Sequence, residues 1–314
     1  MTNAESKQVG SINHLDLDKE KKRQKVGSFF KKAIDYVFLT VASLFSFLPF
    51  YWMVMSSVKT EMEYRQSVPT FFPETFQFAN YPAVLSQTSS GDGSFWQILL
   101  NTVIVGFVST ALGVLLTILT AYALARVEFK GKGILFTLML GTMMIPGEMF
   151  TLTNYLTVAK LGWNDTYTVM IVPFLVSIYY IYLLRNNFKQ IPESLYKAAK
   201  VDGLSDIGYL FKVMVPLTAP TLVSVTLLKF IGTWNSYIWP RLVNSANWQL
   251  VTNWVTRGFV DRGGQLYNGF YGTSMALTTL KMAAVCMVSL PLFILFVSFR
   301  KYIMHGVSKS GTKG

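Results

Sequence analysis

Long apolar stretches run through this sequence, and they restrict the chain to structures that can cross a lipid bilayer. A helix of about twenty residues spans the roughly 30 Å hydrocarbon core, and soluble helices seldom run so long without charge. Charged residues make up only 14% of the chain, against about 25% in soluble domains. The sequence therefore predicts an all-α polytopic membrane protein with six transmembrane helices, at residues 33–55, 98–124, 133–156, 167–188, 218–239 and 272–299.

The basic residues are divided unevenly between the connections of these spans. With the N terminus inside, the inner segments hold most of the 28 lysines and arginines, and the outer segments hold only Lys59, Arg65, Lys160, Arg241, Arg257 and Arg262. The positive-inside rule therefore places both termini in the cytoplasm. Because the net charge of +12 follows this topology, it indicates membrane lipid as a partner and no nucleic acid.

This topology divides the chain into a basic cytoplasmic tail (1–32), a transmembrane domain (33–301) and a short cytoplasmic C-terminal tail (302–314). Signals for enzymatic chemistry are missing. The GKG string at 131–133 lacks the spacing and the hydroxyl residue of a phosphate-binding loop, neither histidine forms an H-E-x-x-H motif, and Cys286 stands alone. We therefore expect no catalytic residue, no metal site and no ATPase site on this chain.

A polar run at 189–217 interrupts the apolar pattern and predicts a helix, a glycine turn and a second helix. Pro192 suits the first helical position, Gly203 can end the helix, and Ser205 or Asp206 can cap the next one. Two faces follow from helical spacing: Leu195, Ala198, Ala199 and Asp202 in the first half, and Ile207, Leu210, Phe211 and Met214 in the second. Periodicity alone fits an interfacial hairpin without a partner equally well.

Three motifs in order resemble one family. The string AAKVDGLS at 198–205, followed by VPL, resembles the EAA loop of ABC importer permeases, and FIGTWNSYIWPRL and HGVSKSGTKG are similar to segments of the maltose-type carbohydrate permeases. The resemblance implies a permease subunit in a bacterial plasma membrane that forms half of the path for an oligosaccharide. It also implies a second permease, two ATPase subunits that hold ATP and Mg, and an extracellular solute-binding protein that delivers the sugar.

The resemblance assigns coupling to the ATPase subunits to the polar run. The implied residues are Glu193, Lys197, Ala198, Ala199, Asp202 and Gly203. Lys197 stands where the family has glutamate, so the usual ion pair with the ATPase cannot form in that way. Either Glu193, one helical turn earlier, replaces it in part or the partner surface carries an acidic residue.

Candidates for the substrate path are polar or aromatic residues inside the spans. A charge at membrane depth costs at least about 2.5 kcal/mol, so Lys229 and Lys281 should face a cavity or a carboxylate, although Lys281 can also snorkel. Pro146 should kink the third span. The other candidates are Glu148, Asn154, Trp234, Asn235, Tyr237 and Trp239.

The sequence leaves alternatives open for both the substrate and the class of protein. If both lysines line the path, they would favour an anionic saccharide such as a uronate or a sialylated sugar, whereas the resemblance favours a neutral one. A secondary transporter would show inverted halves and paired membrane carboxylates, which the sequence does not. A membrane assembly or signalling protein without a substrate is the alternative from another class.

Overall fold

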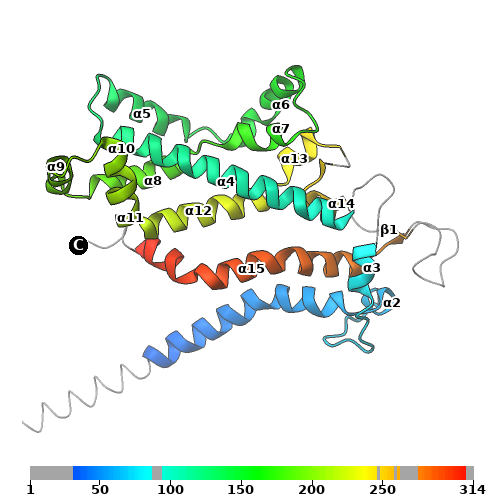
Figure 1. Ribbon diagram of the computed structural model, residues 1–314. Coiled ribbons are helices and arrows are strands. Elements are labelled where there is room, and N and C mark those ends of the chain that lie inside the picture. Colours follow the sequence, from blue (N-terminus) through cyan, green and yellow to red (C-terminus); the bar gives the residue numbers. More distant parts are fainter. Residues whose placement is uncertain (1–30, 87–93, 246–247, 258–259, 262–274, 309–314) are drawn as a thin grey trace, which may run out of the picture.

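The computed structural model describes residues 31–86, 94–245, 248–257, 260–261 and 275–308, which are almost entirely helical (Figure 1). The predicted all-α class is confirmed. The described residues also contain one short antiparallel strand pair, β1 (Val260–Asp261) with β2 (Met275–Ala276), with two residues in each strand. Residues 1–30 and 309–314 of the two predicted tails lie outside the described residues.

Within the described part, three helices are long and apolar enough to cross a membrane unaided. They are the first helix (Lys31–Ser57), α4 (Phe95–Arg126) and α15 (Thr278–Ser308). The most apolar window of the first helix has no buried residue, and this helix diverges from the bundle in Figure 1. Nearly half of the corresponding window of α4 is buried, so α4 is the central helix.

The remaining predicted spans are broken. Three helix pairs are bent by 87°, 47° and 84° respectively, and six candidate spans result when each pair counts as one. In the third pair, the part before the bend (Asp206–Leu217) belongs to the polar run at 189–217, and only α12 falls in the predicted fifth span. Their elements are α5 (Lys132–Thr142) with η1 (Gly147–Phe150) and α6 (Thr151–Lys160); α7 (Tyr167–Ile171) and η2 (Val172–Phe174) with α8 (Ile178–Lys189); and α10 (Asp206–Tyr209), η3 (Leu210–Met214) and α11 (Val215–Leu217) with α12 (Ala219–Trp234).

Prolines explain these breaks. Pro146 directly precedes η1, Pro173 lies within η2, and Pro216 and Pro220 flank the bend before α12. A proline removes one backbone donor and its ring clashes with the preceding turn, so an α-helix cannot continue through it unchanged. The kink predicted at Pro146 is therefore present, as a sharp bend.

Helices α4 and α8 end side by side and cap each other. The Arg126 guanidinium of α4 donates to the carbonyl oxygens of Phe188 (3.2 Å) and Ile191, and the Arg185 Nε of α8 donates to the Leu124 carbonyl oxygen at 3.1 Å. The last carbonyls of a helix have no partner within it, and a positive charge is favourable at that end. The two arginines therefore hold the two helix ends together.

Helices α2 (Glu61–Tyr64) and α3 (Asn80–Ser86) form the opposite end of the molecule around a buried carboxylate. Glu61 is 2% exposed, and its Oε2 accepts hydrogen bonds from the Thr279 backbone N–H (2.9 Å) and hydroxyl (3.0 Å). Arg65 donates to the other oxygen at 2.8 Å. Glu61 thus caps the first turn of α15 and fixes the segment after the first helix to it.

We expect Glu61→Ala to destabilise the protein by about 2 kcal/mol, because it removes hydrogen bonds to a buried charge and leaves the α15 N–H groups uncapped. The purified protein in detergent should show a lower thermal unfolding midpoint. Met62→Ala, at a neighbouring side chain that is 66% exposed, is the control and should leave the midpoint unchanged. Equal midpoints for Glu61→Ala and the unmodified protein would contradict the capping role.

Candidate functional site

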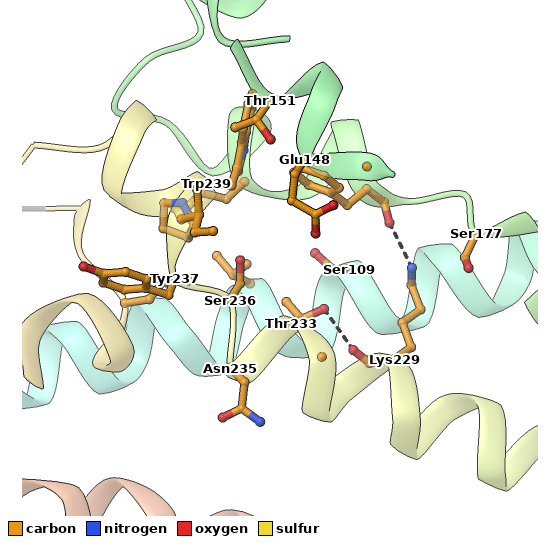
Figure 2. Close-up of a pocket in the computed structure, with 18 of the residues that line it drawn as sticks. Ser109, Glu148, Thr151, Ser177, Lys229, Thr233, Asn235, Ser236, Tyr237 and Trp239 are labelled. Atoms are coloured by element: carbon orange, nitrogen blue, oxygen red, sulfur yellow. Dashed lines mark hydrogen bonds between the residues drawn. The ribbon is translucent and has the colours of Figure 1, made fainter. Parts of the chain in front are cut away.

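A cavity of about 710 Å³ opens between α4, η1, η2 and α12 (Figure 2). Two of the broken pairs contribute the residues at or beside their breaks: Gly147 and Glu148 after Pro146, and Val176 and Ser177 between η2 and α8. The segment between α12 and α13 (Ile238–Val243) adds the rest of this part of the wall. Irregular backbone at membrane depth is tolerated where it lines a cavity or is buried in protein. The breaks after Pro146 and before α8 therefore form part of the cavity wall.

Small hydroxyl side chains dominate the polar part of the wall. They come from α4, α6, the η2–α8 break, α12 and the segment after it: Ser109, Thr151, Ser177, Thr233 and Ser236. The wall also carries Tyr180 and several apolar residues. The sequence does not mark these hydroxyls as path residues, because serine and threonine occur throughout the apolar spans. Ser236 had a signal, since it stands next to Asn235 in the FIGTWNSYIWPRL motif.

Lys229 lies in the cavity wall, but its ammonium group is already engaged. The side chain is 6% exposed, and its Nζ donates to the carbonyl oxygens of Phe174 and Leu175, each at 3.0 Å. These carbonyls lie at the break between η2 and α8, where the regular helical N–H donors are lost. Lys229 therefore supplies the hydrogen bonds that these two carbonyl oxygens lack at the break. Its partner is this pair of carbonyls and not the carboxylate considered from the sequence.

Gly113 of α4 provides the room for this lysine. A Cβ atom at Gly113 would lie 2.0 Å from the Lys229 Cε and 2.6 Å from the Leu175 carbonyl oxygen. Any side chain there would displace the ammonium group from the break. The close approach of α4, α12 and the η2–α8 break thus depends on a residue without a side chain.

The aromatic candidates on the α12–α13 segment have different positions. Trp239 is buried and is fixed by a hydrogen bond from its Nε1 to the Val169 carbonyl oxygen at 2.9 Å, so it is a rigid wall. Tyr237 is 37% exposed and Asn235 is exposed, and both line the cavity. Glu148 joins them from the opposite wall (Figure 2).

Three predicted path residues do not line this cavity. Trp234 is 2% exposed and packs with Phe230 in the apolar cluster on the other face of α12. Asn154 is exposed on α6, and Lys281 is half-buried on α15, which is not part of the cavity wall. Position within an apolar helix therefore does not reveal the face on which a residue lies.

At the far end of α8, the polar run forms a hairpin of α9 (Glu193–Val201) and α10 around Gly203, which has φ +78°. The Gly203 N–H donates to the Lys200 carbonyl oxygen, and the Leu204 N–H donates to the Ala199 carbonyl oxygen. This pair of hydrogen bonds is a Schellman motif, which requires a left-handed conformation at Gly203. Ser205 caps α10 by accepting from the Gly208 N–H at 3.0 Å. Pro192 is the N-cap rather than the first helical residue.

The exposed surface of the hairpin carries most of the predicted coupling residues. Glu193 and Lys197 form an i, i+4 ion pair at 3.4 Å with both side chains largely exposed. Ala198 and Asp202 are exposed as well, and Ala199 alone of the predicted face is buried. The Asp206 carboxylate accepts from Tyr196 and pairs with Lys200 at 2.9 Å, which raises the pKa of Lys200.

The apolar stripe of the second half differs from the predicted one. Tyr209, Leu210 and Met214 are buried against α4 and α8, whereas Ile207 and Phe211 remain 66% and 42% exposed. The reason is that residues Leu210–Met214 form a π-helical turn, which is wider than the α-helical turn assumed from the sequence. Ile207 and Phe211 therefore belong to the outer surface of the hairpin.

Comparison with known proteins gives consistent matches over the chain. Residues 113–309 match the family model of the binding-protein-dependent transport system inner membrane component. The trehalose/maltose transport system permease protein MalG of Thermococcus litoralis is 31% identical, over 90% of this chain and 95% of that protein. The arabinooligosaccharides transport system permease protein AraQ of Halalkalibacterium halodurans is 27% identical, over 90% of this chain and 95% of that protein.

A solved structure has a similar fold. It is a bacterial ABC transporter involved in the import of the acidic polysaccharide alginate, with a TM-score of 0.74 and 24% identity, and the match covers 86% of this chain and 95% of that chain. A second structure, the alginate transporter in complex with an alginate pentasaccharide-bound periplasmic protein, has a TM-score of 0.52 and 14% identity, over 87% and 96% of the respective chains.

We expect Gly113→Ala to impair the protein although alanine is the better helix former by about 1 kcal/mol. The new Cβ would collide with Lys229 and release it from the η2–α8 break, so the thermal midpoint should fall. Gly141→Ala in α5 is the matched control, because no atom lies within 4 Å of that Cβ position, and it should be neutral or stabilising. Equal behaviour of the two variants would show that the Lys229 contact does not matter.

Proposed function

Since this chain belongs to the binding-protein-dependent transport system inner membrane components, we propose that it forms half of the path of an oligosaccharide through an ATP-driven importer. As a sugar ABC importer permease it is a transport subunit and not an enzyme. The observation that carries the proposal is the cavity at the broken spans. Its row of hydroxyls, with the Asn235 amide and the Tyr237 ring, suits the hydroxyl groups and apolar faces of sugar rings.

We propose that a second permease covers the surfaces that this chain leaves open. No residue of α5 is buried, and the apolar window of the first helix is likewise uncovered. In a membrane such faces can contact lipid, but the cavity also borders η1 and α6, which follow α5 directly. A partner packed along α5 and α6 would therefore close the cavity from its open side.

The α9–α10 hairpin is proposed as the contact with the ATPase subunits, which hold ATP and Mg. Its exposed side chains include the apolar residues Leu195, Ile207 and Phe211 and the charged residues Glu193 and Lys197. The hairpin packs through Tyr209, Leu210 and Met214 against the ends of α4 and α8. Both helices continue to the cavity, so movement of the hairpin can reach the path through rigid elements.

This role places the hairpin end of the molecule on the cytoplasmic side, in agreement with the distribution of lysine and arginine. Both termini would then be cytoplasmic. An extracellular solute-binding protein would deliver the sugar at the end formed by α2 and α3. The alginate transporter of similar fold is in complex with a substrate-bound periplasmic protein, which supports a partner of this kind.

Purification of the chain from its native membrane tests the proposal directly. We expect a stable complex with a second permease and ATPase subunits, whose ATP hydrolysis rises when the saccharide-loaded binding protein is added. A chain that purifies alone and transports without ATP would reject the importer function. A complex that no loaded binding protein stimulates would reject saccharide as the substrate class.

We expect Gly203→Val to uncouple the importer while leaving it assembled. Valine at positive φ costs about 1–3 kcal/mol, so the Schellman ending should reorganise and uptake should fall about tenfold or more. Gly162→Val is the matched control, because Gly162 also has positive φ (+68°) and an open Cβ position but lies between α6 and α7. Similar losses of uptake in both variants would argue against a coupling role for the hairpin.

A further inference from the structure

The cavity offers a ligand one accessible charge, and it is negative. Apart from tyrosines, Glu148 and Lys229 are the ionisable residues among those that line it. Glu148 is exposed, and its carboxylate makes no ion pair or hydrogen bond within the described part of the chain. Lys229 is buried and donates to two backbone carbonyls, so a ligand could recruit it only by leaving both carbonyls without a donor.

A buried hydroxyl without a partner lies opposite this carboxylate. Ser109 is 3% exposed, and its Oγ has no hydrogen-bond partner although it lies in the cavity wall. Figure 2 shows the Ser109 hydroxyl and the Glu148 carboxylate pointing toward each other, from α4 and from η1. A buried polar atom left without a partner is costly, and a bound ligand group can supply the missing hydrogen bond.

We propose that Glu148 and Ser109 form a subsite for a sugar hydroxyl, and that Glu148 makes this path select neutral saccharides over acidic ones. This inference rests on the proposed import of saccharide. A sugar hydroxyl can donate to the Glu148 carboxylate and accept from the Ser109 hydroxyl at the same time. The ionised carboxylate of a uronate can only accept hydrogen bonds, so at this subsite it would meet the Glu148 charge without a proton to share.

Two features of this subsite favour neutral over acidic saccharides. The favourable pairing needs a group that is both donor and acceptor, and the like charge acts against the wrong substrate class. Thr151 and Thr233 continue the line of hydroxyls on either side in the wall, which extends the surface along which a saccharide chain can lie. The buried lysine, which suggests an anionic sugar when seen in the sequence, has its role in the broken backbone instead.

Direct binding to the purified complex, without the solute-binding protein, tests the subsite, because the preference of that protein is then removed. A neutral oligosaccharide and a uronate oligosaccharide of equal length are titrated, and the ratio of their dissociation constants is compared between variants. We expect Glu148→Gln to shift this ratio toward the uronate by about tenfold or more. Ser109→Ala should weaken the neutral sugar several-fold.

Two matched controls accompany these variants. Glu128→Gln removes a carboxylate whose side chain is 94% exposed and which does not line the cavity. Thr110→Val removes the neighbouring buried hydroxyl, which also lacks a partner but is not a lining residue. Both should leave the ratio and the affinity for the neutral sugar unchanged.

The outcomes separate the subsite from the transport function. If the loaded binding protein stimulates ATP hydrolysis but Glu148→Gln leaves the ratio as in the unmodified complex, the subsite is wrong and the importer function stands. Tighter binding of the uronate than of the neutral sugar by the unmodified complex, or binding of neither, also overturns the subsite. If no loaded binding protein stimulates hydrolysis, saccharide import itself fails.

Discussion

Broken backbone inside a membrane protein must find hydrogen-bond partners, and the contact of Lys229 with the η2–α8 break meets that demand here. Two carbonyl oxygens at the break receive an ammonium group that reaches them from α12 across Gly113 of α4. Three elements far apart in the sequence are thereby held at one point. The cavity lies beside this point, so its wall depends on the same contact.

The hairpin is tied to this arrangement at the other end of the same helices. Arg126 and Arg185 bind the ends of α4 and α8 to each other, and Tyr209, Leu210 and Met214 pack against them. The chain then turns through the 84° bend into α12, which carries Lys229. The hairpin is therefore joined to the cavity both through packing on α4 and α8 and through the covalent connection to α12.

Lys197 is consistent with this arrangement in spite of its departure from the family pattern. Its ion pair with Glu193 is exposed, and exposed pairs contribute little, about 0–1 kcal/mol. Both charges thus remain accessible to a partner surface. The shape of the hairpin depends instead on Gly203 and on the Ser205 cap, which agree with the pattern.

The sequence by itself determined the membrane class, the kink at Pro146 and the turn at Gly203, because length, proline and positive φ are local properties. The tertiary structure decided which residues meet in the cavity. Trp234 and Trp239 stand in one motif, yet one packs in the core and the other forms the cavity wall. In a membrane helix the lipid-facing and core-facing sides are both apolar, so periodicity does not reveal which face a serine or lysine occupies. The same limit explains why Ser109 had no signal and why the partner of Lys229, a pair of backbone carbonyls, appears only when the helices are packed together.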